Sequence, residues 1–205
     1  MTLYRFIGLV LLLMVPFFAL WYALGALPAA PALWLTQAAL PWALPEVVQS
    51  VAIEGHQLLV LTQFGETGKT VVPLQQADYQ LAFPLNTRIL SYSIPFYAAL
   101  HFSSRIDGSL ERFARGLLVL WVLMFIGTVS VTLKNLMLGL GGDLLWETTT
   151  IPLPSADAIA LLFQFSTLIV PTVAPVLLWA WSVRDSPHWR ALLLGQGAES
   201  DARSR

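Results

Sequence analysis

The chain has no cysteine and few charged residues for its length. Without cysteine it can form no disulfide, no thiolate metal site and no cysteine nucleophile. Only 11% of its 205 residues are charged, whereas soluble domains average about 25%. A net charge of −1 also excludes a nucleic-acid-binding protein that depends on bulk positive charge. Because 57% of the residues are hydrophobic, the composition indicates an integral membrane protein.

Sequence motifs for catalysis and metal binding are missing as well. No G-x-S-x-G nucleophile elbow and no G-x-x-x-x-G-K-[ST] phosphate loop occur in the chain. In the predicted topology the bilayer separates His56 from His101 and His188, which excludes a three-histidine metal site. A hydrolase remains an alternative that would need His56 with an acid such as Asp143 or Glu147. We therefore expect no enzyme activity, no metal and no cofactor.

Four apolar runs approach or exceed the ~20 residues that a transmembrane helix needs. The sequence predicts such helices over residues 3–27, 84–103, 114–138 and 157–183. The first run is longer than the apolar region of a cleavable signal peptide, so we expect it to remain as a span. Ser155 is predicted to cap the last helix at its N-terminus. The fold class is therefore a polytopic α-helical membrane protein.

Basic residues predict the orientation, because short loops rich in Lys and Arg stay in the cytoplasm. With four spans and a cytoplasmic N-terminus, eight of the eleven basic residues lie inside: Arg5, Arg105, Arg112, Arg115, Arg184, Arg190, Arg203 and Arg205. Lys69, Arg88 and Lys134 then lie outside or near the outer interface. If residues 84–103 did not cross the membrane, most of the basic residues would lie on the outer side instead. We therefore predict four spans with both termini in the cytoplasm.

The long interval between the first two predicted spans has two parts. Residues 28–45 are uncharged and rich in proline and tryptophan, which predicts a short helix in the outer interface or a re-entrant segment. In residues 46–83, β-rich runs alternate with glycine turns, which predicts a small extracytoplasmic antiparallel meander. This segment is too short for a stable core of its own, so we expect it to pack on the membrane surface, on residues 28–45 or on a partner. The predicted outer loop 139–156 and cytoplasmic tail 184–205 complete the chain.

Polar side chains in the predicted spans form a candidate site. Arg88 and Tyr92 are spaced to share one face of the second span, Lys134 and Asn135 lie toward the outer end of the third, and Gln164 lies in the fourth. Polar groups at membrane depth are costly and often functional. One interpretation is an outward-opening groove in which Arg88 and Lys134 bind an anion. The other is snorkelling to headgroups and hydrogen bonding between helices.

Residues 83–100 carry a resemblance to a known family. Pro84, Leu85, Asn86, Tyr92, Pro95, Ala98, Ala99 and Leu100 are similar to a stretch in exosortase H-associated membrane proteins, whereas Ser93 and Ile94 replace a Gly-Leu pair. The resemblance implies a bacterial inner-membrane protein beside an exosortase-like transpeptidase that processes C-terminal sorting signals at the outer face. The catalytic residues of that transpeptidase cannot be transferred to this chain.

Two functions follow from these observations. The first is a non-enzymatic accessory or scaffold protein of a protein-sorting or envelope-assembly system, whose outer β segment contacts a membrane protein partner or cargo. The alternative is a small transport or lipid-handling component that uses the polar groove near Arg88 and Lys134. In either case the chain lies in the lipid bilayer and binds no nucleic acid.

Overall fold

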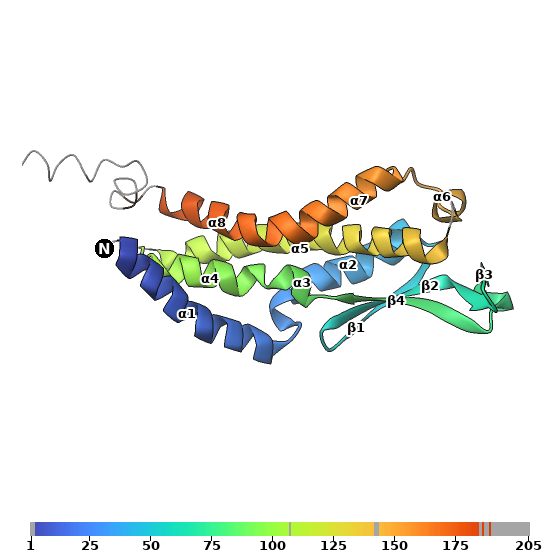
Figure 1. Cartoon of the computed structure of the whole chain (residues 1–205), viewed down its shortest axis with the longest axis horizontal. Coiled ribbons are helices and arrows are strands. Elements are labelled where there is room, and N and C mark those ends of the chain that lie inside the picture. Colours follow the sequence, from blue (N-terminus) through green and yellow to red (C-terminus); the bar gives the residue numbers. More distant parts are fainter. Residues whose placement is uncertain (1–2, 107, 142–143, 185, 187–188, 190–205) are drawn as a thin grey trace, which may run out of the picture. The chain divides into compact units, whose positions relative to one another are not determined.

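The computed structural model (Figure 1) describes residues 3–106, 108–141, 144–184, 186 and 189. These residues form two compact units. The helical unit comprises the described parts of 1–23, 92–120 and 172–205. The mixed unit comprises 24–91 and the described parts of 121–171.

Among the described residues, three helices are long and apolar enough to cross a membrane. They are α1 (Leu3–Leu24), α5 (Ser109–Leu140) and the continuous helix Ala156–Val183. The last consists of α7 (Ala156–Gln164), a π-helical segment η3 (Phe165–Ile169) and α8 (Val170–Val183). As predicted, Ser155 caps this helix, and its side chain accepts a hydrogen bond from the Ala158 N–H. These helices coincide with the first, third and fourth predicted spans.

The predicted span 84–103 is not a single helix. Its first residues end strand β4 (Tyr79–Asn86), and α3 (Arg88–Ser91) and α4 (Ser93–Ser103) follow. An 11-residue helix such as α4 rises only about 16 Å, roughly half of the hydrocarbon core. Pro84 and Pro95 explain the division, because one lies at a sheet edge and the other in the first turn of a helix, where proline is tolerated. The described part of the chain thus has three candidate spans where four were predicted.

A buried tyrosine joins α4 to the first turns of α5 in the helical unit. Tyr97 is 0% exposed and stacks on Phe113 with ring centroids 5.4 Å apart. Its hydroxyl oxygen lies 3.4 Å from the Arg112 carbonyl oxygen. A Cβ atom at Gly116 would lie 2.1 Å from the Tyr97 hydroxyl oxygen. The close approach of these two helices therefore requires glycine at position 116.

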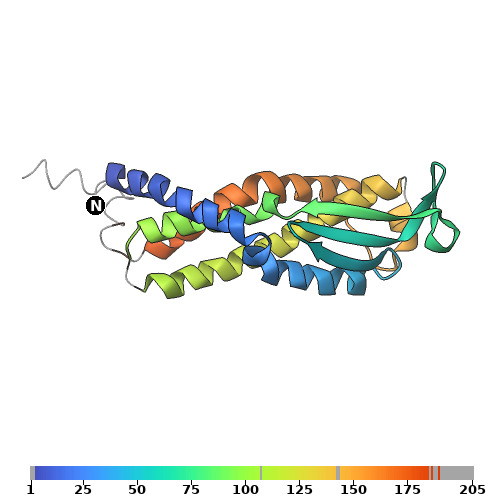
Figure 2. The ribbon, with the colours of Figure 1, turned by 90° about the horizontal axis from the view of Figure 1, so that it is seen from below.

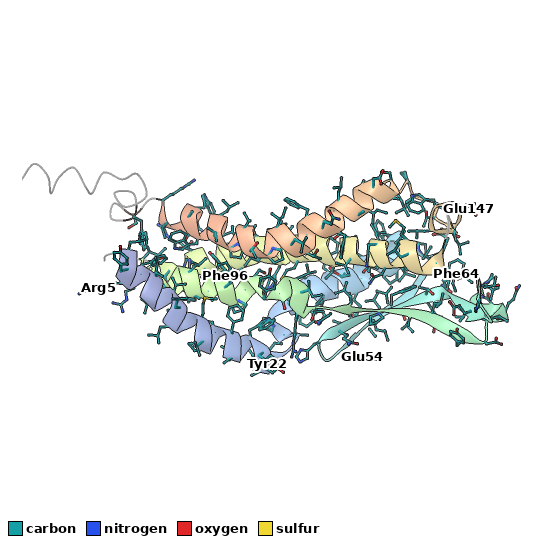
Figure 3. All side chains as sticks on the ribbon, viewed as in Figure 1. Arg5, Tyr22, Glu54, Phe64, Phe96 and Glu147 are labelled. Carbon is teal, nitrogen blue, oxygen red and sulfur yellow. The ribbon has the colours of Figure 1, made fainter. Side chains whose placement is uncertain are left out.

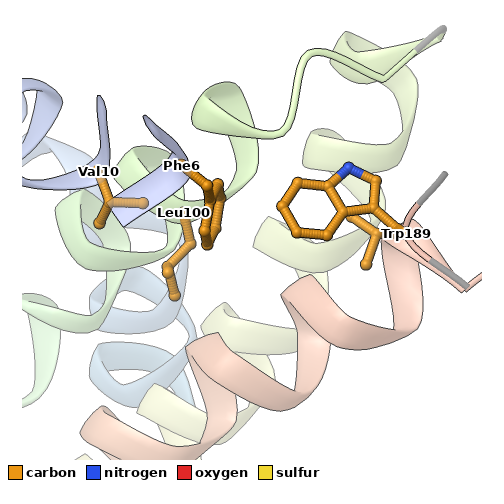
Figure 4. Close-up of a cluster of buried hydrophobic side chains, with 5 residues drawn as sticks. Phe6, Val10, Leu100 and Trp189 are labelled. Carbon is orange, nitrogen blue, oxygen red and sulfur yellow. The ribbon is translucent and has the colours of Figure 1, made fainter. Parts of the chain in front are cut away.

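A second cluster in the helical unit joins three helices to a residue beyond α8 (Figure 4). Its buried members are Phe6, Val10, Leu100, Val183 and Trp189. The Phe6 ring stacks on Trp179, with centroids 5.2 Å apart, and meets Trp189 edge-on. Both indole N–H groups donate to Ser104, one to its hydroxyl oxygen and one to its carbonyl. Trp189 thus belongs to the packed unit, and most of the predicted tail lies outside the described residues.

A four-stranded antiparallel sheet forms the centre of the mixed unit. Its strands are β1 (Val48–Glu54), β2 (Gln57–Thr67), β3 (Thr70–Pro73) and β4. Figure 3 shows Glu54 at the β1–β2 turn, where it pairs with Gln57. The predicted meander is wrong in one connection, because β4 pairs with β2 and not with β3. Since Gly65 and Glu66 pair with both β3 and β4, the turn η2 (Leu74–Gln76) carries the chain to the other edge of β2.

The helix predicted within 28–45 is present and covers part of the sheet. It begins after a short turn, η1 (Leu27–Ala29), and forms α2 (Ala30–Ala43), which packs against β1 (Figure 2). Gln37 Nε2 donates to the Val51 carbonyl oxygen over 2.8 Å. On α5, the buried Thr128 hydroxyl lies 2.7 Å from that of Thr36. Hydrogen bonds from two neighbouring polar residues therefore tie α2 to β1 and to α5.

Candidate functional site

A groove of about 470 Å³ lies in the mixed unit, between the end of β4, α3, α5 and η3. Most of its wall is apolar and comes from Pro84, Leu85, Ile89, Leu90, Val131, Phe163 and Leu168. Its polar groups belong to Asn86, Lys134, Asn135 and Thr167. A concave, mostly apolar surface with a few polar groups is typical of sites that bind small ligands.

Lys134 supplies the positive charge of the groove. Its ammonium nitrogen lies 4.9 Å from the centre of the Phe163 ring and 3.5 Å from Asn135 Oδ1. Both Lys134 and Asn135 are half-buried. Residues 116–133 of the same helix carry no charge, so Lys134 follows an apolar stretch of bilayer length. A cation held beside an aromatic ring in this position is suited to an anionic group on an otherwise apolar molecule.

The π-helical segment η3 forms one wall of the groove for a local reason. Pro171 has no N–H and cannot bond to the carbonyl of Thr167, which its ring would also crowd. Just before it the helix widens, and the Val170 N–H donates to the Phe165 carbonyl oxygen, five residues earlier. The Thr167 hydroxyl donates to the Phe163 carbonyl oxygen over 2.7 Å. Single π turns of this kind often occur at functional sites.

Arg88 lies against His56, which occupies the β1–β2 turn. The Arg88 guanidinium is 2.5 Å from His56 Nε2. Because a guanidinium can only donate, Nε2 is the acceptor and the proton of the neutral ring is on Nδ1. The Thr87 hydroxyl and the Thr87 N–H both donate to the His56 carbonyl oxygen. Gly25 also lies close, since a Cβ atom there would be 3.1 Å from His56 Cε1.

Comparison with known families identifies the chain at the level of a family. A model described as "Exosortase H-associated membrane protein" matches residues 1–186. The chain belongs to this family. The match includes the three candidate spans and the sheet, and it confirms the resemblance seen in residues 83–100. No curated protein and no solved structure matches the chain.

In this exosortase H-associated membrane protein, the residues predicted to form the polar groove occupy several places. Lys134 and Asn135 line the groove together, whereas Arg88 donates to His56. Tyr92 lies between α3 and α4 and is assigned to the helical unit. Gln164 is exposed and lines a separate, shallow apolar hollow on α7 and η3.

Two contributors to the groove were not predicted from the sequence, and the alternative hydrolase site lies only partly within the described residues. Asn86 and Phe163 line the groove, and the one local signal was Pro171, which accompanies the widened turn near Phe163. Of the acids considered for a hydrolase, Asp143 lies outside the described residues, and Glu147 lies on α6 (Leu144–Thr148; Figure 3). Within the described residues, no group of three or more His, Asp and Glu side chains is placed to hold a metal ion.

Proposed function

We propose that this chain is a non-enzymatic accessory or scaffold protein of the bacterial inner membrane. Through its sheet it would contact an exosortase-like transpeptidase on the outer side. The observation that carries this proposal is the family match over residues 1–186. This single match covers both the candidate spans and the sheet. The family name states an association with exosortase H and with the membrane.

Strand β4 offers the surface for this contact. Within the described part of the chain β4 pairs only with β2, so its second edge carries backbone groups that can pair with another strand. At the start of β4, Tyr79 is 54% exposed, and its hydroxyl donates to Glu66 Oε2 over 2.5 Å. This hydrogen bond raises the pKa of Tyr79, so the phenol is neutral at physiological pH. Tyrosine is enriched among the residues that dominate binding energy at interfaces.

The test is recovery of a partner from the native host. The tagged full-length chain is solubilised in detergent, pulled down and examined by mass spectrometry, and one stoichiometric membrane transpeptidase is expected. Tyr79→Ala is expected to reduce that recovery at least about fivefold, because removing a central interface residue typically costs more than about 1 kcal/mol. Tyr4→Ala is the matched control: Tyr4 is 88% exposed on α1, and its replacement should leave recovery unchanged.

Two outcomes would contradict this proposal. Recovery of the chain alone from the wild-type strain would remove the accessory role. Equal losses for Tyr79→Ala and Tyr4→Ala would show that the sheet is not the contact surface. Insertion of each variant into the membrane is verified by fractionation, so that loss of the protein is not mistaken for loss of the partner.

We also propose that both ends of the chain face the cytoplasm. In the helical unit the start of α1, the end of α4, the start of α5 and the end of α8 lie at one end (Figures 1 and 2). This arrangement gathers Arg5, Arg105, Arg112, Arg115 and Arg184 on one side, in keeping with the rule that basic loops stay inside. It requires that α3 and α4 return the chain toward the cytoplasm, even though no single helix there is of full length.

Single-cysteine labelling tests this topology cleanly, because the natural chain has no cysteine. Lys69→Cys, in the exposed β2–β3 turn, is expected to react with a membrane-impermeant maleimide in intact spheroplasts. Leu110→Cys, at a position 74% exposed in the first turn of α5, is expected to react only after lysis. Labelling of both residues in intact spheroplasts would exclude a cytoplasmic location for the arginine-rich end.

The groove supports a second candidate function, a lipid-handling or transport component. Its apolar wall and single ammonium group match an acyl chain with an anionic head. Under this function a photoactivatable anionic acyl lipid is expected to crosslink to peptides containing Ile89, Val131 or Phe163. Replacing Lys134 with alanine should abolish the crosslink while leaving membrane insertion intact, whereas Arg88→Ala, which removes a partner of His56 outside the groove, should leave the crosslink in place. Crosslinking that is spread evenly over all exposed apolar helix faces would contradict it.

A further inference from the structure

A basic pocket of about 170 Å³ lies in the helical unit, between the first turns of α5 and the end of α8. It is lined by Glu111, Arg112, Arg115, Trp181, Ser182 and Arg184. Three guanidinium groups therefore face one carboxylate, which leaves the pocket with a net positive charge. Neither the groove nor the sheet described above contributes a residue to it.

Contacts within the pocket position two of its three arginines. Arg112 Nη1 donates to the Ser182 carbonyl oxygen over 2.6 Å, which ties the start of α5 to the end of α8. The Arg184 guanidinium carbon lies 5.5 Å from the centre of a Trp181 ring, at a cation–π distance. Arg115 forms an exposed ion pair with Glu111. Guanidinium groups are planar, permanently charged and matched in shape to phosphate oxygens.

The neighbouring sequence places this pocket at the depth of the lipid headgroups. Arg115 directly precedes the uncharged stretch 116–133, and Arg184 directly follows the uncharged stretch 158–183. Trp181 is 46% exposed, as expected for an aromatic residue at a membrane interface. About one turn farther into the apolar stretches, Leu118 on α5 is 58% exposed and Leu177 on α8 is 63% exposed. The basic pocket therefore continues into an apolar surface.

We propose that this basic pocket binds the phosphate of an anionic phospholipid, with the acyl chains lying along Leu118 and Leu177. Free phosphate shares the chemistry of the headgroup but lacks the acyl chains, and the exposed leucines favour the lipid. Basic pockets between membrane helices on the cytoplasmic side are suited to anionic headgroups. This inference rests on the proposed orientation but is independent of the proposed accessory function, because it concerns a different unit and a different ligand.

The same unit provides a matched control for diffuse electrostatic attraction. A second cavity, of about 570 Å³, is lined by Arg5 and Arg105 together with Leu9, Ser104, Ile106, Ser186 and Trp189. It has two arginines but lacks the arrangement of three guanidinium groups beside an exposed tryptophan. Neutralising Arg5 and Arg105 therefore removes as much charge as neutralising Arg115 and Arg184, while leaving the basic pocket intact.

Native mass spectrometry of the full-length protein in detergent measures the binding of added phosphatidylglycerol and of phosphatidylcholine. The wild type is expected to retain phosphatidylglycerol at least about tenfold more tightly than phosphatidylcholine. The variant R115Q/R184Q is expected to lose about tenfold in affinity for phosphatidylglycerol, and R5Q/R105Q less than about twofold. Arg5 and Arg115 lie in the first two turns of their helices, and Arg105 and Arg184 lie outside helices, so both variant proteins should remain folded by circular dichroism.

Glu111→Gln provides a test in the opposite direction. It removes the carboxylate that competes for Arg115, so affinity for phosphatidylglycerol is expected to rise about threefold. Equal losses in the two arginine double variants would overturn the proposal, because attraction would then be diffuse. Equal retention of the two lipids would overturn it as well. Displacement of phosphatidylglycerol by inorganic phosphate at equal concentration would show that the pocket recognises free phosphate and not a lipid.

Discussion

Replacing Gly65 with alanine is expected to disrupt the sheet and to abolish recovery of the proposed partner. A Cβ atom at position 65 would lie 2.2 Å from the Tyr79 carbonyl oxygen and 2.4 Å from Ala77 Cβ. The nearest obstacle is backbone, so the start of β4 must move away from β2. Overpacking a tight site typically costs about 1–3 kcal/mol, and a displaced strand places this change near the upper limit.

Hydrogen exchange measures this effect locally. In Gly65→Ala the amides of β2 and β4 near positions 65 and 79 should exchange at least about a hundredfold faster, as a loss of about 3 kcal/mol implies. Gly8→Ala is the control, because no atom beyond the adjacent residues and the nearby backbone of its own helix lies within 4 Å of the added methyl group, and helices favour alanine over glycine. Unchanged exchange in Gly65→Ala would mean that β2 and β4 are not packed as described.

Gly116→Ala is expected to have the largest effect in the helical unit. The added methyl group would lie 2.1 Å from the Tyr97 hydroxyl oxygen and 2.4 Å from Cζ of the same ring. Tyr97 has no free space, since it is fully buried and stacked on Phe113. We expect the variant to lose about 3 kcal/mol of unfolding free energy in detergent, because α4 must move away from α5.

A double-variant cycle identifies the cause of that loss. Tyr97→Leu shortens the side chain that meets the new methyl group, so Gly116→Ala should cost less than about 1 kcal/mol in the Tyr97→Leu background. Strict additivity of the two changes would show that the glycine acts through the flexibility of α5 and not through its contact with Tyr97.

Hydropathy predicted the helices correctly wherever one apolar run corresponds to one helix. The runs within 3–27, 114–138 and 157–183 are predominantly apolar, and each contains or overlaps a helix of spanning length. The same criterion wrongly predicted a single spanning helix over residues 84–103, because the end of a half-buried strand and a short buried helix together form one apolar run. The residue pattern does not mark the change of element at Thr87. In the sheet, the β-rich runs and glycine turns predicted an antiparallel meander, but pairing of β4 with β2 depends on both edges of β2 being available.

The candidate site was predictable only in part. Lys134 and Asn135 are neighbours in the chain, so one apolar run was enough to place them together. Arg88 was grouped with them by its predicted depth, yet the hairpin turn brings His56 to it from more than thirty residues away. Phe163 could not be assigned to the groove, because the rotation of its helix depends on the widened turn before Pro171.

Strand β4 has a consequence for communication between two surfaces of the mixed unit. Its first residue, Tyr79, belongs to the proposed contact surface, while its last residues, Pro84, Leu85 and Asn86, are part of the groove wall. If a molecule bound at one end of β4 favours one position of the strand, it also changes the affinity of the other end for its own binding partner. Thermodynamic reciprocity then requires equal factors: if a groove ligand tightens the partner, the partner tightens the ligand by the same amount.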